Sequence, residues 1–577
     1  MEAPSPYALR PWMGQYGSHI AHTLAAPVHA HLGAMADAAV QVFAAQTAFT
    51  TVMPNGMYGS LSYTQVGEMS DAFAAYLREV LKLQAGDRVA LQMPNCLAYP
   101  VVLLGVLKAG CVAVNTNPLY TPAEMVHQFN DSGAKAVVVV DMFADKLEQA
   151  LPKTGVKHVV LTRVSEFFPA VVGPIVRGVM KYWNKLIPAH GMSFTALPQA
   201  LAQGRDKKGD GARYTQGLGH DSLALLQYTG GTTGVAKGAM LTHGNLLWNL
   251  SQMRAMSASH IEDGREVVLT ALPLYHVFAF TVNFLCMFDA GARNILVPNP
   301  RPIQNLQRAF ENYPITWVTG VNTLYNALLG EEWFTAFPPK HLKAAGGGGA
   351  AMHHAVVERF EAVTSAPLVE GYGLTESSPV VCFQPLNAKR LRDSIGIPAP
   401  MTEVRLVDER GQEVPLGQPG ELLARGPQVM QGYWQRPADT ADVLKDGWLH
   451  TGDVAVMDEQ GTFRIVDRKK DMILVSGFNV YPNEIEDVLS RHPKVLEAAV
   501  VGMPDSKTGE AVHAHVVKRD ASLSSEELLA HCRTLLTGYK RPRLIEFRSE
   551  LPKSPVGKIL RRELRPAATA KTTTPAA

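Results

Sequence analysis

The sequence has few cysteines and no long apolar run. Its five cysteines are scattered over 577 residues, and none of them forms a Cys-x-x-Cys pair. This pattern argues against structural zinc and fits a reducing compartment. No apolar run reaches the roughly 18 residues of a membrane span, and the N-terminus has no basic region ahead of an apolar segment. We therefore expect a cytoplasmic protein, or at most one that binds a membrane surface.

Charge of either sign is also in short supply. Charged residues make up 18% of the sequence, and 54 Lys and Arg against 52 Asp and Glu leave a formal net charge of +2. A balance this even does not indicate nucleic acid as a partner. Because hydrophobic residues reach 46%, the chain is globular rather than disordered. Its length exceeds what one core supports, so about two to four domains are expected.

One glycine-rich loop stands out because it fits neither of two common nucleotide-binding motifs. Residues 228–238 read Tyr-Thr-Gly-Gly-Thr-Thr-Gly-Val-Ala-Lys-Gly and follow an apolar run at 223–226. The glycines let backbone N–H groups face a ligand, and the hydroxyls and Lys237 suit phosphate. The loop lacks the Gly-Lys-Ser/Thr of a Walker A loop and the Gly-x-Gly-x-x-Gly of a dinucleotide turn. It predicts a nucleotide phosphate site and argues against kinases, GTPases and dehydrogenases, with a flexible linker as the alternative.

Strand and helix patterns alternate after an Ala/His-rich stretch in residues 1–60 that has no recognisable chemistry. Apolar residues recur at helical spacing from 69 to 81, and 88–93 reads as a strand. The further expected elements are a helix at 99–108 and strands at 111–115, 137–140 and 158–161. This alternation predicts βαβ units around a buried parallel sheet.

The C-terminal part of the chain has a different pattern. From 402 to 425, short strands alternate with Gly/Pro turns, which predicts a small antiparallel β subdomain. Strand patterns at 496–501 and 511–517 and a helix pattern at 524–536 predict a small α+β domain. The tail from residue 567 is rich in Ala, Thr and Pro and is expected to be disordered.

Residues 171–188 combine apolar side chains with regularly spaced cations. Arg177, Lys181 and Lys185 recur every four residues and would line one face of a helix. A basic amphipathic helix of this kind can lie on a membrane surface. The other reading is an ordinary surface helix with one buried face.

Six short segments carry candidate functional side chains, and three of them suit a nucleotide. Tyr372 and Glu376 share one segment, in which the ring can stack on adenine and the carboxylate can hold Mg²⁺. Glycines 346–349 allow close backbone approach, and Asp453 after a Thr-Gly turn can accept ribose hydroxyls. The other three segments are the aromatic surroundings of His276, the charge run 467–471 and the Gly-bearing turn of Lys558. Each segment is weak alone, since a lone His is more often a core residue and a lone Lys a surface residue.

The order and spacing of these segments resemble the adenylate-forming superfamily, which includes acyl-CoA synthetases, firefly-type luciferases and peptide-synthetase adenylation domains. The resemblance runs from about residue 62 to residue 565 and is greatest to bacterial long-chain fatty-acid–CoA ligases. Its most specific part is 446–470, DGWLHTGDVAVMDEQGTFRIVDRKK, which is similar to the fatty acyl-CoA synthetase signature and continues through 471–482.

The fold class that this resemblance implies is α/β. It consists of a large N-terminal domain of αβ-layered sheets with a small β subdomain, followed by a small, mobile α+β C-terminal domain. The expected boundaries are an N-terminal extension at 1–60, an AMP-binding N-terminal domain at 61–469 that includes the β subdomain at about 400–466, a C-terminal mobile domain at 470–566 and a disordered tail at 567–577.

The resemblance also implies a nucleotide site. Lys558, Glu376 and Thr232 are the implied catalytic residues: Lys558 bridges the substrate carboxylate and the α-phosphate, and Glu376 is the Mg²⁺ ligand. Tyr372 would pack on adenine, and Asp453 and Arg468 would contact the ribose. The full set of implied ATP-binding residues is Thr229, Gly230, Gly231, Thr232, Thr233, Gly234, Lys237, Gly348, Tyr372, Gly373, Thr375, Asp453 and Arg468.

Four further residues match positions outside the nucleotide site. Lys470 corresponds to the hinge about which the small domain rotates. Gly477 corresponds to the loop that lines the coenzyme A tunnel after the rotation. His276 and Phe280 fall in the segment that gates the acyl channel.

The implied reaction uses Mg²⁺ as cofactor and ATP and coenzyme A as co-substrates. A fatty acid carboxylate attacks the α-phosphate to give an acyl-adenylate and pyrophosphate, and the coenzyme A thiol then displaces AMP. No protein nucleophile is needed, which agrees with the absence of a Gly-x-Ser-x-Gly motif. Luciferase activity fits less well, because the 446–470 block matches the fatty-acid enzymes.

Other functions remain open from the sequence. A ligase for medium-chain acids, or an acyl-AMP ligase that loads a carrier protein, would carry many of the same motifs, although the latter usually has an insertion before the hinge. A fatty-acid binding or uptake protein without catalysis is a different class, and Lys558, Glu376 and Asp453 argue against it. Peripheral contact with the inner face of the cytoplasmic membrane and a homodimer are further expectations.

Overall fold

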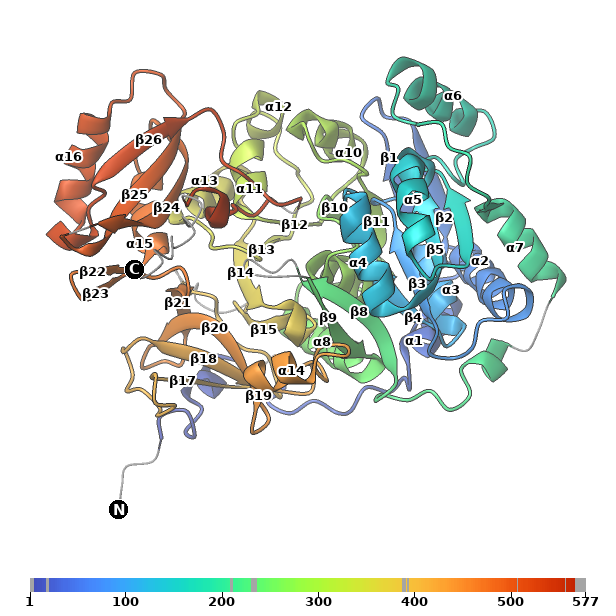
Figure 1. The fold of residues 1–577 in the computed structure, drawn as a ribbon, viewed down its shortest axis with the longest axis horizontal. Coiled ribbons are helices and arrows are strands. Elements are labelled where there is room, and N and C mark those ends of the chain that lie inside the picture. The colour runs from blue at the N-terminus through green and yellow to red at the C-terminus, as the bar shows by residue number, and fades with distance from the viewer. Residues whose placement is uncertain are drawn as a thin grey trace, which may run out of the picture.

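The structure, a computed structural model, describes residues 5–16, 20–207, 211–229, 236–386, 391, 394–505, 507–555 and 557–565. Figure 1 shows a large domain with two sheets and their helices, a β subdomain at the lower left and a C-terminal domain at the upper left. The predicted α/β class, with a large layered domain, a β subdomain and a small α+β domain, is confirmed.

One sheet of the large domain has seven strands in the order β7-β6-β5-β3-β4-β8-β9. All neighbours pair in parallel except β8 and β9, which form an antiparallel pair. The strands are β3 (Arg88–Gln92), β4 (Val112–Asn115), β5 (Ala134–Val140), β6 (His158–Thr162), β7 (Thr195–Ala196), β8 (Leu223–Thr229) and β9 (Lys237–Thr242). The valine-rich β5 is almost wholly buried, as is typical of a parallel sheet with helices on both faces. The predicted βαβ alternation is therefore confirmed.

A second, nine-stranded sheet has the order β16-β15-β14-β13-β12-β10-β11-β1-β2. Its strands are β1 (Thr47–Val52), β2 (Tyr58–Ser62), β10 (Val267–Thr270), β11 (Arg293–Leu296), β12 (Trp317–Gly320), β13 (Ala344–Gly347), β14 (Leu368–Gly373), β15 (Val380–Phe383) and β16 (Ile397–Pro398). Strand β1 pairs in parallel with β11, so residues before 61 are part of this sheet. The expected domain boundary at 60/61 falls inside β2 and does not coincide with an edge of the folded domain.

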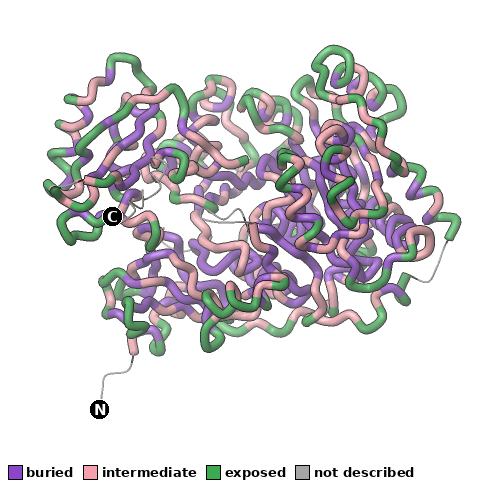
Figure 2. Tube along the Cα trace, in the orientation of Figure 1, coloured by how far each residue is buried: buried purple, intermediate pink, exposed green. Residues whose placement is uncertain are grey.

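Helices cover both sheets and continue the chain between the strands. They are α1 (Leu32–Val42), α2 (Tyr63–Ala75), α3 (Ala98–Lys108), α4 (Pro122–Ser132), α5 (Ala144–Ala150), α7 (Leu197–Asp206), α8 (His243–Ser257), η7 (Ala279–Cys286), α9 (Met287–Asp289), α10 (Gln307–Asn312), α11 (Asn322–Leu328), α12 (Glu332–Thr335) and α13 (His354–Thr364). Every residue of α3 is buried between its neighbours. Figure 2 shows the buried residues of these sheets and helices in purple.

The N-terminal segment connects the β subdomain to the large domain. The Tyr7 hydroxyl donates to the Val414 carbonyl at 2.9 Å, and the Trp12 ring packs on Phe463 with centroids 5.9 Å apart. The Tyr16 hydroxyl donates to the Pro398 carbonyl at 2.9 Å. The subdomain strands are β17 (Glu403–Val407), β18 (Gly420–Arg425), β19 (Leu444–Lys445), β20 (Trp448–Met457) and β21 (Phe463–Arg468), all antiparallel. The predicted antiparallel subdomain is confirmed.

The C-terminal domain has its own core of apolar side chains. Its strands are β22 (Ile473–Val475), β23 (Phe478–Val480), β24 (Val495–Asp505), β25 (Gly509–Lys518) and β26 (Leu544–Arg548), and its helices are α15 (Pro482–Ser490) and α16 (Ser525–Leu535). The long β24–β25 hairpin and helix α16 agree with the strands and helix predicted for this region.

The basic segment at 171–188 forms a short helix, α6 (Val172–Gly178), that continues as η5 (Val179–Trp183). Val176 and Met180 face the core, whereas Tyr182 and Trp183 are 76% and 85% exposed. In the part of the chain that is described, none of the helices has both the length and the apolar character needed to cross a membrane.

Candidate active site

A cavity of about 2410 Å³ lies where the large domain, the β subdomain and the C-terminal domain meet. Gly348 of the large domain, Asp453 of the subdomain and Lys558 of the C-terminal domain all line it. Sites for one small molecule usually measure about 300–1,000 Å³. This cavity is therefore large enough for more than one ligand at a time.

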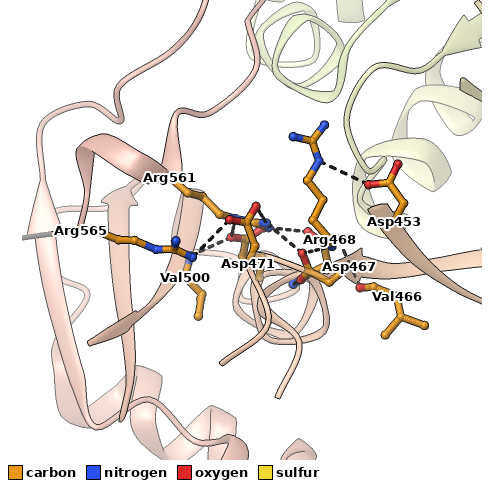
Figure 3. Close-up of polar contacts among 10 residues, drawn as sticks. Asp453, Val466, Asp467, Arg468, Asp471, Val500, Arg561 and Arg565 are labelled. Carbon is orange, nitrogen blue, oxygen red and sulfur yellow. Dashed lines mark hydrogen bonds and ion pairs between the residues drawn. The ribbon is translucent and has the colours of Figure 1, made fainter. Parts of the chain in front are cut away.

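Three of the expected ATP-binding residues meet at the subdomain side of the cavity. The Tyr372 hydroxyl donates to Asp453 Oδ2 at 2.6 Å. Asp453 and Arg468 are opposite each other on β20 and β21, with Arg468 Nε 3.5 Å from Asp453 Oδ1 (Figure 3). Burial, and then the Asp453 carboxylate, raise the pKa of Tyr372 well above its usual value, so the phenol stays a donor.

Glu376 sits in a short turn directly after β14, where it lines the cavity. The Tyr433 hydroxyl donates to Glu376 Oε1 at 2.6 Å, and the Met430 N–H donates to the Glu376 carbonyl at 2.8 Å. Among the described residues, no group of three or more His, Cys, Asp or Glu side chains gathers to hold a metal. A single carboxylate of this kind suits a cation that brings most of its own ligands.

The ends of the glycine-rich loop lie at the same cavity. Thr229 ends β8 and is directly opposite Lys237, which begins β9. The Lys237 ammonium pairs with the carboxylate of Asp439 in α14 (Pro437–Val443) and lies 5.3 Å from the centroid of the Tyr433 ring. Between these ends, Gly230, Gly231, Thr232, Thr233 and Gly234 lie outside the described residues. The structure therefore places Thr229 and Lys237 and leaves the remaining loop residues as predictions.

Two glycines allow the backbones at the cavity wall to pack closely. A Cβ on Gly348 would lie 2.9 Å from the Gly371 carbonyl and 3.4 Å from the Phe278 ring. A Cβ on Gly373 would lie 1.9 Å from the Pro379 carbonyl, which is an impossible contact. Both positions therefore require glycine, and Thr375 follows them in the wall.

Lys558 reaches the cavity from a tight turn of the C-terminal domain. The Ser554 N–H donates to the Lys558 carbonyl at 2.7 Å, and Gly557 adopts φ +89° between them. The Thr323 hydroxyl of the large domain donates to the Gly557 carbonyl at 3.2 Å, which seats the turn across the domain boundary. Burial, and then the positive charge of Arg468, lower the pKa of Lys558 to about 7.

In the segment that was expected to gate the acyl channel, some side chains line the cavity and others lie in the core. His276 and Phe278 line the cavity, and burial, followed by the charge of Lys558, lowers the pKa of His276 to about 4. Phe280 is 0% exposed, packs edge-on against Phe284 and is absent from the described lining residues. Helix η7 therefore directs the Phe280 ring into the core and leaves Phe278 at the cavity, and the gate stays a prediction.

The expected hinge residue, Lys470, lies beside a cluster of ion pairs. Arg561 pairs with Asp467 at 3.2 Å and with Asp471 at 3.5 Å (Figure 3), and also with Glu486 at 2.7 Å. Asp467 lies in β21 of the β subdomain, whereas Glu486 and Arg561 belong to the C-terminal domain, so the cluster joins the two parts beside the expected hinge residue. Burial raises the pKa of Asp467 to about 6 although Arg561 opposes this change.

Gly477 lies away from the cavity in this structure. It occupies the turn between β22 and β23 with φ +85° and is exposed. The cavity therefore receives Lys558, and the turn that the resemblance assigns to coenzyme A faces solvent.

Sequence reasoning missed Tyr433, Asp439 and Arg561. Tyr433 contacts Glu376 from 57 positions away and Asp439 contacts Lys237 from 202 positions away. The Gly-Tyr-Trp run at 432–434 is a weak signal for a binding aromatic, and Arg561 follows Lys558 closely enough to belong to the same segment. None of these signals identifies the partner of the side chain.

Comparisons with known proteins agree with this geometry. A family model described as AMP-binding enzyme matches residues 36–434, and one described as AMP-binding enzyme C-terminal domain matches residues 484–558. A protein from Yersinia pestis named long-chain-fatty-acid–CoA ligase is 52% identical over 556 residues, which cover 96% of this chain and 97% of that protein. A protein of the same name from Escherichia coli O6:H1 is 50% identical over 564 residues, 97% of this chain and 98% of that protein. The solved structure of the anthranilate CoA ligase AuaEII with anthranoyl-AMP has a TM-score of 0.82 at 24% identity, covers 93% of this chain and 97% of that one, and shows the shared fold.

Proposed function

Because the chain belongs to the AMP-binding enzyme family, we propose that it is a long-chain fatty acid–CoA ligase. It joins a long-chain fatty acid to ATP with release of pyrophosphate and then transfers the acyl group from the adenylate to coenzyme A. The names of relatives that match nearly the whole chain support this substrate class. The observation that carries the proposal is the entry of Lys558 into a cavity that Asp453, Arg468 and Glu376 also line.

The residues of the cavity suit the first half-reaction. A carboxylate and the phosphates of ATP repel each other, so attack on the α-phosphorus depends on positioning and charge neutralisation. Lys558 and Lys237 reach the cavity from different domains and supply positive charge. His276, whose pKa is about 4, is neutral at neutral pH and adds no repulsion near Lys558. The carboxylate oxygen bonds to phosphorus as pyrophosphate leaves, and no protein nucleophile takes part.

Glu376 is the residue that would hold Mg²⁺. Mg²⁺ in nucleotide sites is usually bound through one or two carboxylates, with phosphate oxygens and waters as the other ligands, and the Glu376 carboxylate fits that pattern. When bound, the ion neutralises phosphate charge. The Tyr433 hydroxyl fixes one carboxylate oxygen at 2.6 Å and so orients the group.

The second half-reaction needs a different lining of the same cavity. A rotation of the C-terminal domain about Lys470 would withdraw Lys558 and bring the turn at Gly477 toward the reacting centre. The coenzyme A sulfur then bonds to the acyl carbon, the thiol proton is lost and AMP leaves. We expect Lys470→Pro to block this rotation and to spare adenylate formation, which is read as pyrophosphate release with slow AMP release.

The test is pyrophosphate and AMP release with Mg-ATP over saturated acids from acetate to stearate, with and without coenzyme A. Turnover that depends on coenzyme A and is greatest with long chains supports the proposal. A maximum at medium chains would identify a medium-chain ligase instead. Pyrophosphate release that coenzyme A does not stimulate would indicate a carrier-loading enzyme, and no release with any acid would leave a binding protein.

A contact with a membrane surface is the second part of the proposal. Val171, Ile175, Val179, Tyr182 and Trp183 expose apolar surface along α6 and η5. Arg177, Lys181 and Lys185 belong to the same segment and complement anionic lipid headgroups. This combination fits a helix that lies in the interface of an anionic bilayer, on the inner face of the cytoplasmic membrane. The homodimer stays a prediction.

Vesicle co-sedimentation tests the membrane contact. We expect binding to vesicles that contain phosphatidylglycerol, a loss of binding at high salt, and weaker binding of the Trp183→Ser variant and of the Lys181→Glu, Lys185→Glu variant. Phe337→Ser is the matched control, because Phe337 is an equally exposed aromatic residue on another part of the surface. Unchanged co-sedimentation of both test variants would remove the proposed contact.

A further inference from the structure

The cavity has an apolar lobe behind the nucleotide side. Helix α8, η7, α9 and strand β12 border it, and its described lining residues there are Met253, Ser257, Ile261, Val282, Cys286, Met287 and Trp317. None of these side chains carries a formal charge. A lobe lined in this way suits a hydrocarbon chain and excludes a charged group.

Strand β12 runs along one side of the lobe, and its alternate residues face the cavity. Side chains alternate along a strand, so Trp317 and Thr319 share one face and Val318 faces the other, where it packs near Tyr325. The Thr319 hydroxyl donates to Asn283 Oδ1 of η7 at 2.7 Å, and Thr319 lines the cavity. Thr319 is directly opposite Gly346 on β13, near the carboxyl ends of the strands. Trp317 lies two residues, or about 6.6 Å, further from that end.

Trp317 is a firmly held part of the lining of this lobe. The residue is 4% exposed, and its backbone pairs with Val268 on one side and Ala344 on the other. Its side chain belongs to a separate packed cluster with Ile261 and Met287. An indole held between two strands and backed by packed neighbours cannot move aside as an exposed loop residue would.

We propose that Trp317 forms the closed end of the acyl channel and sets the longest chain that the enzyme activates efficiently. The inference rests on the proposed function and names a residue that determines specificity within it. Each methylene buried in an apolar site strengthens binding about fourfold. The kcat/KM for pyrophosphate release should therefore rise with chain length until the terminal methyl group reaches the indole, and fall for longer acids.

The experiment compares chain-length profiles of kcat/KM, from octanoate to docosanoate, for the full-length enzyme and its variants. In Trp317→Ala the maximum should move to acids longer by about two to four methylenes, since an engineered cavity of about 150 Å³ holds a benzene-sized ligand. Trp317→Phe should show a smaller shift. Ile261→Phe fills the same lobe, so its maximum should move to shorter acids. Phe334→Ala is the control, because Phe334 is buried in a cluster outside the cavity lining and its loss should leave the profile unchanged.

The outcomes separate this inference from the proposed function. If the wild-type enzyme releases pyrophosphate with fatty acids but Trp317→Ala and Ile261→Phe keep its profile, Trp317 is not the end of the channel and the ligase assignment stands. If the wild-type enzyme releases none with any acid, the proposed function fails and this inference with it. If Trp317→Ala does not fold, the Ile261→Phe and Trp317→Phe profiles decide.

Discussion

The Tyr372 hydroxyl donates a 2.6 Å hydrogen bond to Asp453 and thereby joins the large domain to the β subdomain at the candidate nucleotide site. Tyr372 is the last residue but one of strand β14, and Asp453 lies within β20, 81 positions further along the chain. The bond fixes the carboxylate that the resemblance assigns to the ribose. Its loss should therefore affect nucleotide binding more than the chemical step.

Tyr372→Phe should raise the KM for ATP about tenfold, since a hydrogen bond to a charged group contributes about 1.5 kcal/mol or more. The kcat for pyrophosphate release should change by less than about threefold, because the phenyl ring remains. Tyr63→Phe is the control, since among the described residues the Tyr63 hydroxyl bonds only to the carbonyls of Phe288 and Ala292, in the core. Equal KM values for wild type and Tyr372→Phe would show that the bond does not position Asp453 for ATP.

The pH dependence of adenylation should report Lys558. Its pKa of about 7 means that the fraction of charged lysine in the free enzyme falls as the pH rises through 7. If the charged form is required, kcat/KM for adenylation should decline by up to tenfold per pH unit above that point. Bound phosphates favour the charged form, so the decline in kcat should appear at a higher pH.

Lys558→Arg provides the matched control for this profile, because a guanidinium stays charged over the whole range. Its activity will be lower, but the decline above pH 7 should disappear. A decline that persists in Lys558→Arg would assign it to another group.

Gly557→Ala should impair adenylation selectively. The alanine Cβ would lie 2.9 Å from the Thr323 hydroxyl, and φ +89° is strained for any residue with a side chain. The turn must shift, and displacement of a positioned group by about 1 Å can cost about 100-fold in rate. We expect pyrophosphate release to fall 10- to 100-fold, while thioester formation from a supplied acyl-adenylate stays near the wild-type rate.

Two further variants serve as comparisons for the Gly557→Ala assay of the two half-reactions. Lys558→Ala should show the same selectivity with a larger loss. Gly538→Ala, in the same domain, places its Cβ in open space and should leave both half-reactions unchanged. Equal losses of both half-reactions in Gly557→Ala would indicate general damage to the C-terminal domain.

Arg561→Met should destabilise the C-terminal domain far more than Arg565→Met. Arg561 is largely buried and pairs with Asp467, Asp471 and Glu486, so its removal leaves buried carboxylates unpaired at a cost of about 3–5 kcal/mol. Arg565 is more exposed and pairs with Asp471 alone in the described residues, so its loss should cost less than about 1 kcal/mol. Hydrogen exchange of the β24–β25 hairpin measures the difference, and equal protection in the two variants would contradict it.

Local patterns in the sequence predicted most of the fold. Strand β5 was recognisable because Val137 to Val140 are β-branched and apolar, and the small α+β domain because its strands and helix α16 differ in period. The boundary at residue 60 could not be predicted, because the pairing of β1 with β11 joins segments more than 200 positions apart. Register between distant strands depends on tertiary packing, which local periodicity does not encode.

In the candidate site too, some residues could be predicted from sequence motifs and others could not. Tyr372, Asp453, Arg468 and Lys558 came from motifs, and the structure brings them to one cavity. Phe280 was placed by its position in a motif, and only the helical turn of η7 shows that this ring faces the core. The partners Tyr433 and Asp439 needed coordinates, since a hydroxyl or carboxylate far along the chain gives no sign of which residue it contacts.

The contacts of Tyr7 and Trp12 with the β subdomain, and of Tyr16 with strand β16 of the large domain, have a mechanical consequence for the expected hinge. Rotation about a hinge requires that one of the two joined parts stays fixed. This N-terminal segment attaches the β subdomain to the large domain. The β subdomain carries Asp453 and Arg468. A truncation that removes Trp12 should therefore weaken nucleotide binding, although Trp12 is not among the described residues of the cavity wall. The segment 5–16 would thus hold the β subdomain in place during the proposed rotation of the C-terminal domain.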